Sequence, residues 1–255
     1  MAPLKAILFD MDDTLIDWSQ GDGSFHQLEL ERFQSVCDYL VGLGYTPPSP
    51  AWLVEQLPQR AERAWKIAHE TLISPHLPQL IMDMLFEAGI PNTALDVPTF
   101  IEYYGWDAAP GVMPFRDVPP ALDIFVQHGI QLGIVTNAYQ TAPMRQRELK
   151  TQSLWHYFQH CLITAADVGR LKPHPSIFQA ALSALNVQPH ETVFVGDNLV
   201  ADVLGSQRMG MKAVWRKVAH HHYSQATQES ILPDATITDF TQLFPHLDAW
   251  FPAWR

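Results

Sequence analysis

The chain has 255 residues, of which 47% are hydrophobic and 17% charged, and this composition excludes intrinsic disorder as the main state. Its 16 Lys and Arg residues stand against 27 Asp and Glu residues, which gives a net charge of −11 and disfavours binding to nucleic acid or to an anionic membrane. An anionic small molecule would therefore need a local group of positive charges built for it.

The first predicted element is a buried strand over residues 6–9, which ends at Asp10. In extended backbone, side chains two residues apart point the same way, so Asp10 and Asp12 can face one ligand together. Two neighbouring carboxylates suit a nucleophile with a general acid–base, and they also suit a hard cation such as Mg²⁺. Taken alone, the pair is more typical of a capped turn or a solvated acidic loop than of a catalytic site.

The segment that follows, from about residue 18 to residue 110, shows helical patterns and no clear strand. Apolar periodicity predicts helices over 25–43, 51–72 and 77–88. The two ends of this block, 17–23 and 108–114, are rich in Gly, Pro or Asp, as expected of hinges.

Four further short apolar runs come later in the chain, and each ends at a polar or turn residue: 132–135, 161–163, 193–195 and 213–215. Unbroken apolar runs indicate parallel strands that are buried on both faces. A helical pattern over 175–185, with Pro175 in its first turn, lies between the later strands. The alternation predicts an α/β fold, an open parallel Rossmann-like sheet with helices on both faces.

These predictions together give a domain organisation. Residues 1–17 and 111–255 form an α/β core, and residues 18–110 form a helical domain inserted after the first strand. In open α/β sheets the ligand binds at the carboxyl ends of the strands, so the polar residues that end the apolar runs are candidates to meet in space.

Three more groups of candidate residues stand at or after these strand ends. Thr136 and Asn137 offer a hydroxyl and backbone N–H groups for an anionic oxygen. Lys172, held before a proline, offers a point positive charge for phosphate. Asp197 and Asp202 offer carboxylates that can complete a metal site with Asp10. Each group alone also fits an ordinary turn, a surface lysine or a helix cap.

In this order, the segments FDMDDTLID, GIVTNA, GRLKPHPSIF and VFVGDNLVAD resemble the four motifs of the haloacid dehalogenase (HAD) superfamily. The resemblance covers about 4–17 and 111–243, and the helical insertion stands where this family carries its type-one cap. It implies that Asp10 is a nucleophile that forms an aspartyl-phosphate, and that Asp12 is the general acid and then the general base. It also implies that Thr136 and Lys172 hold the phosphoryl oxygens.

The same resemblance implies Mg²⁺ as the cofactor. Asp10, the main-chain carbonyl of Asp12 and Asp197 would hold the ion, with Asp202 orienting Lys172 or a metal-bound water. This agrees with electrostatics, because an anionic nucleophile approaches an anionic phosphate only when cations lie between them.

The presence of an aspartate at position 12 indicates which of the reactions known in this superfamily to expect. Dehalogenation needs no acid at this position, because a halide leaves without a proton, and the phosphonatase branch relies on a cap lysine instead. We therefore expect hydrolysis of a small phosphorylated metabolite. A phosphomutase uses the same two aspartates and stays open as an alternative, as does a dehalogenase-type hydrolase of the same superfamily. A non-catalytic phosphate-binding or regulatory module is a further alternative, although Asp10, Asp12 and Asp197 are all retained.

The cap is expected to select the substrate by closing over the site. Side chains that could line its entrance, none of them assigned to the site, are Trp18, His26, Arg60, Arg63, Lys66, His69, Tyr103, Tyr104 and Trp106. The basic members of this set could face an anionic substrate, or they could pair with Glu55, Glu62 and Glu70. The histidines at 220–222 are interpreted as a solvated loop after the last core strand.

The cysteines and the apolar segments bear on location. Cys37 and Cys161 have no spacing typical of a disulfide framework or a zinc site. The N-terminal apolar run is too short for a signal peptide, and no run approaches the roughly 18 residues of a membrane span. We expect a soluble, cytoplasmic protein without nucleic-acid or membrane partners, either a monomer or a homodimer.

Overall fold

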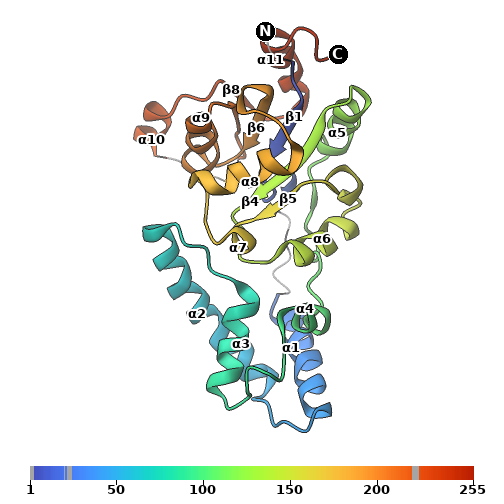
Figure 1. Cartoon of the computed structure of the whole chain (residues 1–255), viewed down its shortest axis with the longest axis vertical. Coiled ribbons are helices and arrows are strands. Elements are labelled where there is room, and N and C mark those ends of the chain that lie inside the picture. The colour runs from blue at the N-terminus through green and yellow to red at the C-terminus, as the bar shows by residue number, and fades with distance from the viewer. Residues whose placement is uncertain (1–2, 20, 22–24, 220–223) are drawn as a thin grey trace.

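The computed structural model describes residues 3–19, 21, 25–219 and 224–255. The histidine tract and part of the first predicted hinge therefore lie outside the described residues. Figure 1 shows the chain as two groups of elements, an α/β core that carries both termini and a set of helices, α1 to α4, beside it. Among the described helices, none combines the length and the apolar character that crossing a bilayer needs.

The core is built on a six-stranded sheet with the order β5-β4-β1-β6-β7-β8, in which every described pairing is parallel. The strands are β1 (Ala6–Phe9), β4 (Gln131–Thr136), β5 (Leu162–Thr164), β6 (Thr192–Gly196), β7 (Lys212–Arg216) and β8 (Ala235–Ile237). The predicted α/β fold class is confirmed. The expectation that the run ending at Trp215 is the last core strand is wrong, because β8 follows it as a short edge strand with one exposed residue.

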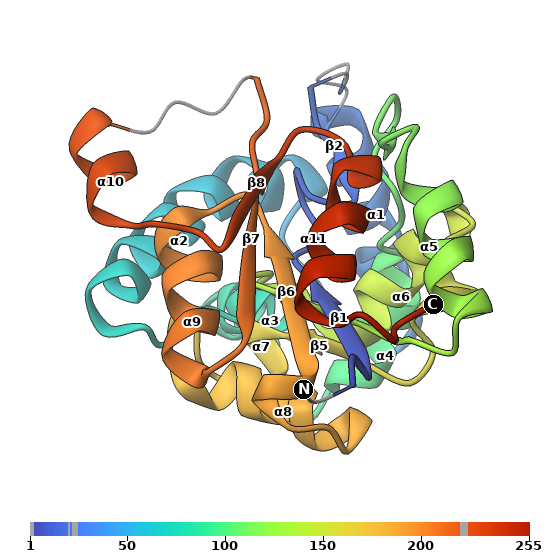
Figure 2. The ribbon, with the colours of Figure 1, turned by 90° about the horizontal axis from the view of Figure 1, so that it is seen from above.

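Helices cover both faces of the sheet. Ile7 and Phe9 of β1 belong to one apolar cluster, and Ala6 and Leu8 belong to another, so alternate residues of this strand face opposite layers. The first layer contains α5 (Val118–Gln127) and α11 (Leu243–Trp250), and the second contains α8 (Pro175–Leu185) and α9 (Gly205–Met209), as Figure 2 shows.

The remaining helical segments of the core are shorter or lie beside the sheet. They are α6 (Ala142–Thr151), α7 (Ala165–Val168), α10 (Gln225–Ser230), the 3-10 turns η1 (Trp155–Tyr157), η2 (Pro189–Glu191) and η4 (Phe240–Gln242), and the π-helix η3 (Leu199–Leu204).

The helices between the first strand and the rest of the core are α1 (Phe25–Gly42), α2 (Pro50–Thr71), α3 (Leu77–Glu87) and α4 (Val97–Tyr104). They enclose their own apolar cluster, which includes Phe33, Leu57, Ile81 and Phe100. The three predicted helices are observed within about two residues of their expected ends. The short helix α4, capped by Asp96, was not predicted.

Two short strands, also not predicted, connect the helical insertion to the core. β2 (Ile16–Asp17) pairs antiparallel with β3 (Met113–Pro114), so the chain that leaves the core is bonded to the chain that returns. This pair fixes one end of the insertion directly beside the loop that follows β1.

Candidate active site

The candidate residues meet at the carboxyl ends of the three central strands. Asp10 follows β1, Thr136 ends β4 and Asp197 follows β6, and β1 lies between the other two strands. They line a cavity of about 230 Å³ together with Asp12, Asp13, Asn137, Lys172, Asn198, Ala201 and Asp202. Every site residue predicted from the sequence is therefore part of one cavity.

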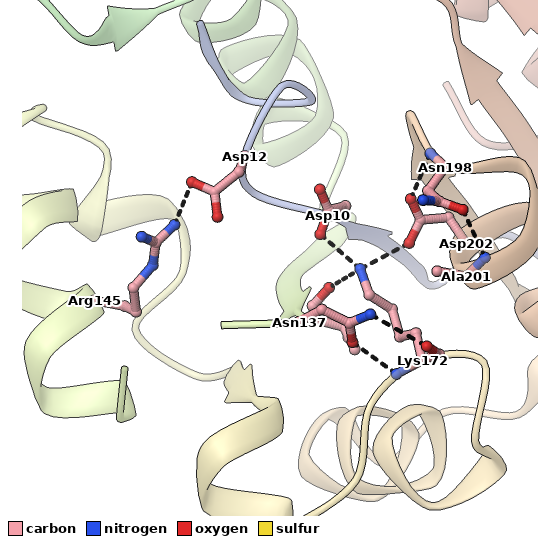
Figure 3. A network of polar contacts seen from close by, with 9 residues as sticks. Asp10, Asp12, Asn137, Arg145, Lys172, Asn198, Ala201 and Asp202 are labelled. Carbon is pink, nitrogen blue, oxygen red and sulfur yellow. Dashed lines mark hydrogen bonds and ion pairs between the residues drawn. The ribbon is translucent and has the colours of Figure 1, made fainter. Parts of the chain in front are cut away.

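Lys172 is the positive centre of this cavity. Its Nζ lies 2.6 Å from Asp10 Oδ1 and 2.7 Å from Asp202 Oδ1, and it donates to the main-chain oxygen of Val135 at 2.7 Å, as Figure 3 shows. Burial lowers the pKa of this ammonium, but the charges of Asp10 and Asp202 outweigh burial and raise it above the usual lysine range. The buried lysine therefore stays charged.

The carboxylates outnumber this single ammonium. Burial raises the pKa of Asp10 to about 7, with the charges of Asp202 and Asp12 adding to the effect and Lys172 opposing it. Burial and the charges of Asp10 and Asp202 raise the pKa of Asp197 to about 9. The buried carboxylates therefore repel one another, and Lys172 alone does not offset this repulsion.

A divalent cation would offset the repulsion among these carboxylates. Oxygen atoms of Asp10, Asp197 and Asp202 all lie within 4.8 Å of one another, and the three residues are buried. Carboxylate oxygens are the ligands that Mg²⁺ prefers, so the donor set suits a hard cation.

Asp202 is held beneath this cluster by the loop that follows β6. Asn198 donates its backbone N–H to Asp202 Oδ2 at 2.9 Å, and its side chain caps η3 by accepting from Val200 and Ala201. A Cβ on Gly196 would lie 2.3 Å from Asp202 Oδ2, so this position has no room for a side chain. Asp202 is therefore held by the loop after β6 while it contacts Lys172 at 2.7 Å.

Asn137 lines the cavity, but its amide joins two loops. Its Oδ1 accepts the backbone N–H of Lys172 at 2.7 Å, and its Nδ2 donates to the carbonyl of the same residue at 3.2 Å. The side chain therefore holds the Lys172 loop against the end of β4, while Thr136 beside it is almost completely buried.

Asp12 points to a second set of residues, which sequence reasoning missed. Its Oδ1 accepts Trp18 Nε1 at 2.8 Å and Arg145 Nη2 at 2.6 Å. Arg145 Nη1 lies 2.9 Å from Glu148 Oε2, and both residues are buried on α6. The one signal in the sequence was that these two charges stand next to the apolar Met144 and Leu149 at helical spacing, on the buried side of the helix.

The side chains considered for the cap entrance contact different parts of the structure. Trp18 contacts Asp12, and Trp106 donates to Glu148 at 3.2 Å. Arg60 pairs with Glu87 of α3 at 2.5 Å, a partner that lies outside the set considered from sequence spacing.

The chain is similar to proteins of known family. The family model of the haloacid dehalogenase-like hydrolases matches residues 4–210. The chain is 29% identical over 221 residues to the glyceraldehyde 3-phosphate phosphatase of Pyrococcus abyssi, an alignment that covers 84% of this chain and 82% of that protein. The crystal structure of an HAD phosphatase from Thermococcus onnurineus matches with a TM-score of 0.56 and 26% identity, over 95% of this chain and 97% of that one.

A second solved structure, the 2-haloacid dehalogenase of Pseudomonas syringae pv. Tomato DC3000, matches with a TM-score of 0.63 and 26% identity, over 97% of this chain and 99% of that one. The residues matched by the family model include every predicted site residue. The chain is therefore an enzyme that belongs to the haloacid dehalogenase-like hydrolases.

Proposed function

We propose that this hydrolase is a Mg²⁺-dependent phosphatase that cleaves a small phosphomonoester through an aspartyl-phosphate on Asp10. The observation that carries the proposal is the placement of the Lys172 ammonium 2.6 Å from the Asp10 carboxylate in a cavity lined by Thr136 and Asp197. Phosphoryl transfer needs a positioned nucleophile and concentrated positive charge. Relatives named as phosphatases support the same reaction.

In the first step an Asp10 carboxylate oxygen attacks phosphorus, and the bond from phosphorus to the ester oxygen breaks. Asp12 gives a proton to that leaving oxygen, so the alcohol departs neutral. Lys172, the Thr136 hydroxyl and the backbone N–H groups after β4 would hold the phosphoryl oxygens in this proposal. In the second step a water attacks phosphorus and Asp12 accepts a proton from it. The bond from phosphorus to the Asp10 oxygen breaks, which frees the Asp10 carboxylate and releases inorganic phosphate.

Mg²⁺ is the cofactor in this proposal, because Asp10, Asp197 and Asp202 are buried close together, and mutual repulsion adds to burial in raising the pKa values of Asp10 and Asp197. Asp10, Asp197 and the main-chain carbonyl of Asp12 would hold the ion, and bound Mg²⁺ would offset the charge of the phosphoryl group. Asp202 keeps Lys172 in place through its 2.7 Å contact.

We also propose the division into a core (1–17 and 111–255) and a substrate-selecting cap (18–110). Support comes from the separate apolar cluster of α1 to α4 and from the β2–β3 pair at the junction. The substrate class is a small phosphorylated metabolite, and a triose phosphate is the first to test because of the relatives' names. A cytoplasmic location agrees with Cys37 and Cys161, which are both free and buried.

The test measures phosphate release from p-nitrophenyl phosphate and from glyceraldehyde 3-phosphate, with Mg²⁺ and with EDTA, in the native protein and in Asp10→Asn. We expect release that requires Mg²⁺ and disappears in the variant. The variant must keep the circular dichroism spectrum of the native protein. Release that persists in Asp10→Asn would contradict the mechanism.

Two further measurements address the alternatives. Halide release from 2-chloropropionate would favour a dehalogenase, and transfer of labelled phosphate between hydroxyls of one sugar without release would favour a phosphomutase. A folded protein that does none of these and still binds phosphate would favour the non-catalytic module.

A further inference from the structure

Arg145 is a buried cation that the proposed reaction does not yet use. It extends from α6 to the loop after β1, with 2% of its surface exposed, and its guanidinium contacts both Asp12 and Glu148. Burying an arginine is costly unless its charge is paired, so its position beside Asp12 calls for a reason.

We propose that Arg145 is a positioning residue that fixes the side chain of Asp12 for proton transfer to the leaving group. This proposal rests on the proposed phosphatase function. Arg145 and Trp18 both donate to the same oxygen, Oδ1 of Asp12, at 2.6 and 2.8 Å. Among the described residues none donates to Oδ2, so this oxygen is left to carry the proton.

The guanidinium suits this task because of its shape. Nη2 contacts Asp12 while Nη1 contacts Glu148, so one planar group is fixed at two points. A lysine would bring a single charged nitrogen on a flexible stem and could not hold both carboxylates in the same way. Glu148 supplies the second negative charge that keeps the buried arginine in place.

Glu148 in turn is held by the segment that returns from the helical insertion. Trp106 donates to Glu148 Oε2 at 3.2 Å, and Arg32 of α1 lies over the Trp106 ring at 4.5 Å. Thr151, at the end of α6, donates to Asp107 at 2.6 Å. The contacts thus form a continuous path from α1 through the linker and α6 to Asp12, and Figure 3 shows its last step from Arg145 to Asp12.

The test uses the dependence of rate on the leaving group. p-Nitrophenolate is stable as an anion and leaves p-nitrophenyl phosphate without protonation. The alkoxide of glycerol, which leaves glycerol phosphate, needs a proton from Asp12. In Arg145→Met we expect kcat/KM for glycerol phosphate to fall about 100-fold and kcat/KM for p-nitrophenyl phosphate to fall less than about 5-fold. This constant reports the first phosphoryl transfer alone, so the later use of Asp12 as a base, which both substrates share, does not enter it. Arg145→Lys should recover only part of the loss.

A matched control is Arg216→Lys. Arg216 has the same 2% exposure and a paired carboxylate, but that carboxylate is Asp117, whereas Arg145 contacts Asp12. This variant should lower Tm as Arg145→Lys does and leave the ratio of the two kcat/KM values unchanged. Trp106→Phe, which removes the N–H donated to Glu148 and keeps an aromatic ring under Arg32, should move that ratio about 3-fold in the same direction as Arg145→Met.

An equal loss of kcat/KM on both substrates in Arg145→Met would overturn the proposal, and so would a gain on glycerol phosphate, which would mean that Arg145 restrains Asp12. If Arg145→Met does not fold, the ratio in Glu148→Gln and Trp106→Phe decides in the same way. Absence of phosphate release by the native protein on both substrates would instead refute the proposed function.

Discussion

Replacing Asp197 with asparagine is expected to stabilise the metal-free protein. The carboxyl has a pKa of about 9 in the folded protein against 3.8 as its ordinary value. At about pH 7.5 the folded protein therefore keeps a proton on Asp197 that the unfolded chain has lost. Keeping this proton lowers the free energy of unfolding by about 1.4 kcal/mol for each pH unit above the ordinary pKa of 3.8. The upper limit is about 5 kcal/mol, and a neutral amide removes this cost.

The effect has a defined sign and pH range. A raised folded-state pKa makes the native state more stable at low pH, and this advantage is lost as pH rises from about 4 towards 9. The Tm of Asp197→Asn should therefore equal that of the native protein near pH 4. At pH 7.5 the Tm of the variant should exceed that of the native protein by at least about 4 °C, which corresponds to about 2 kcal/mol for a chain of this size.

The assay is thermal denaturation in EDTA at pH 4, 6 and 7.5, followed by circular dichroism. Asp202→Asn is the matched control, because it makes the same chemical change in the same cluster and removes a carboxylate that Lys172 contacts at 2.7 Å and Asn198 at 2.9 Å. It should lower the unfolding free energy by about 1–3 kcal/mol. If both variants shift Tm in the same direction, the account of the charge balance is refuted.

Three other outcomes are expected. Mg²⁺ should raise Tm more at pH 9 than at pH 6, because protons on Asp10 and Asp197 compete with the ion and the pKa values of these groups are about 7 and about 9. An equal rise in Tm at both pH values, measured by differential scanning fluorimetry, would contradict this. Lys172→Met should keep the fold and lose at least about 100-fold in phosphate release, measured by a molybdate assay with native protein as reference; near-native release would refute the role of its charge. Gly196→Ala should lower both Tm and kcat, because its Cβ would lie 2.3 Å from Asp202 Oδ2. Gly129 has open space around it but a positive φ, so Gly129→Ala should lower Tm and leave kcat unchanged. The opposite pattern would refute the packing argument.

The candidate site was readable from sequence because its residues belong to strand ends. Asp10, Thr136 and Asp197 each stand at or directly after a short apolar run, and parallel strands bring their carboxyl ends to one edge of a sheet. A local pattern repeated three times was therefore sufficient to predict that these side chains line one cavity, as they do.

Elements with a weak local pattern were missed. β8 has three residues and lies at the sheet edge, and α4 has eight residues. β8 has no unbroken apolar run, because its middle residue, Thr236, is polar and exposed, and α4 is too short for a clear helical period. The existence of both elements depends on the strand or helices that they pack against.

The sequence by itself determined the sheet, the helical insertion and the set of residues at the strand ends, because hydrophobic periodicity and turn residues act over a few neighbouring positions. The tertiary structure alone decided the surroundings of Asp12. Arg145 and Asp12 are 133 residues apart, and the segment around Arg145 has the composition of a solvated helix. Only the packing of α6 against the loop after β1 buries that charge and supplies its partner, and packing depends on contacts between distant segments that no local pattern encodes.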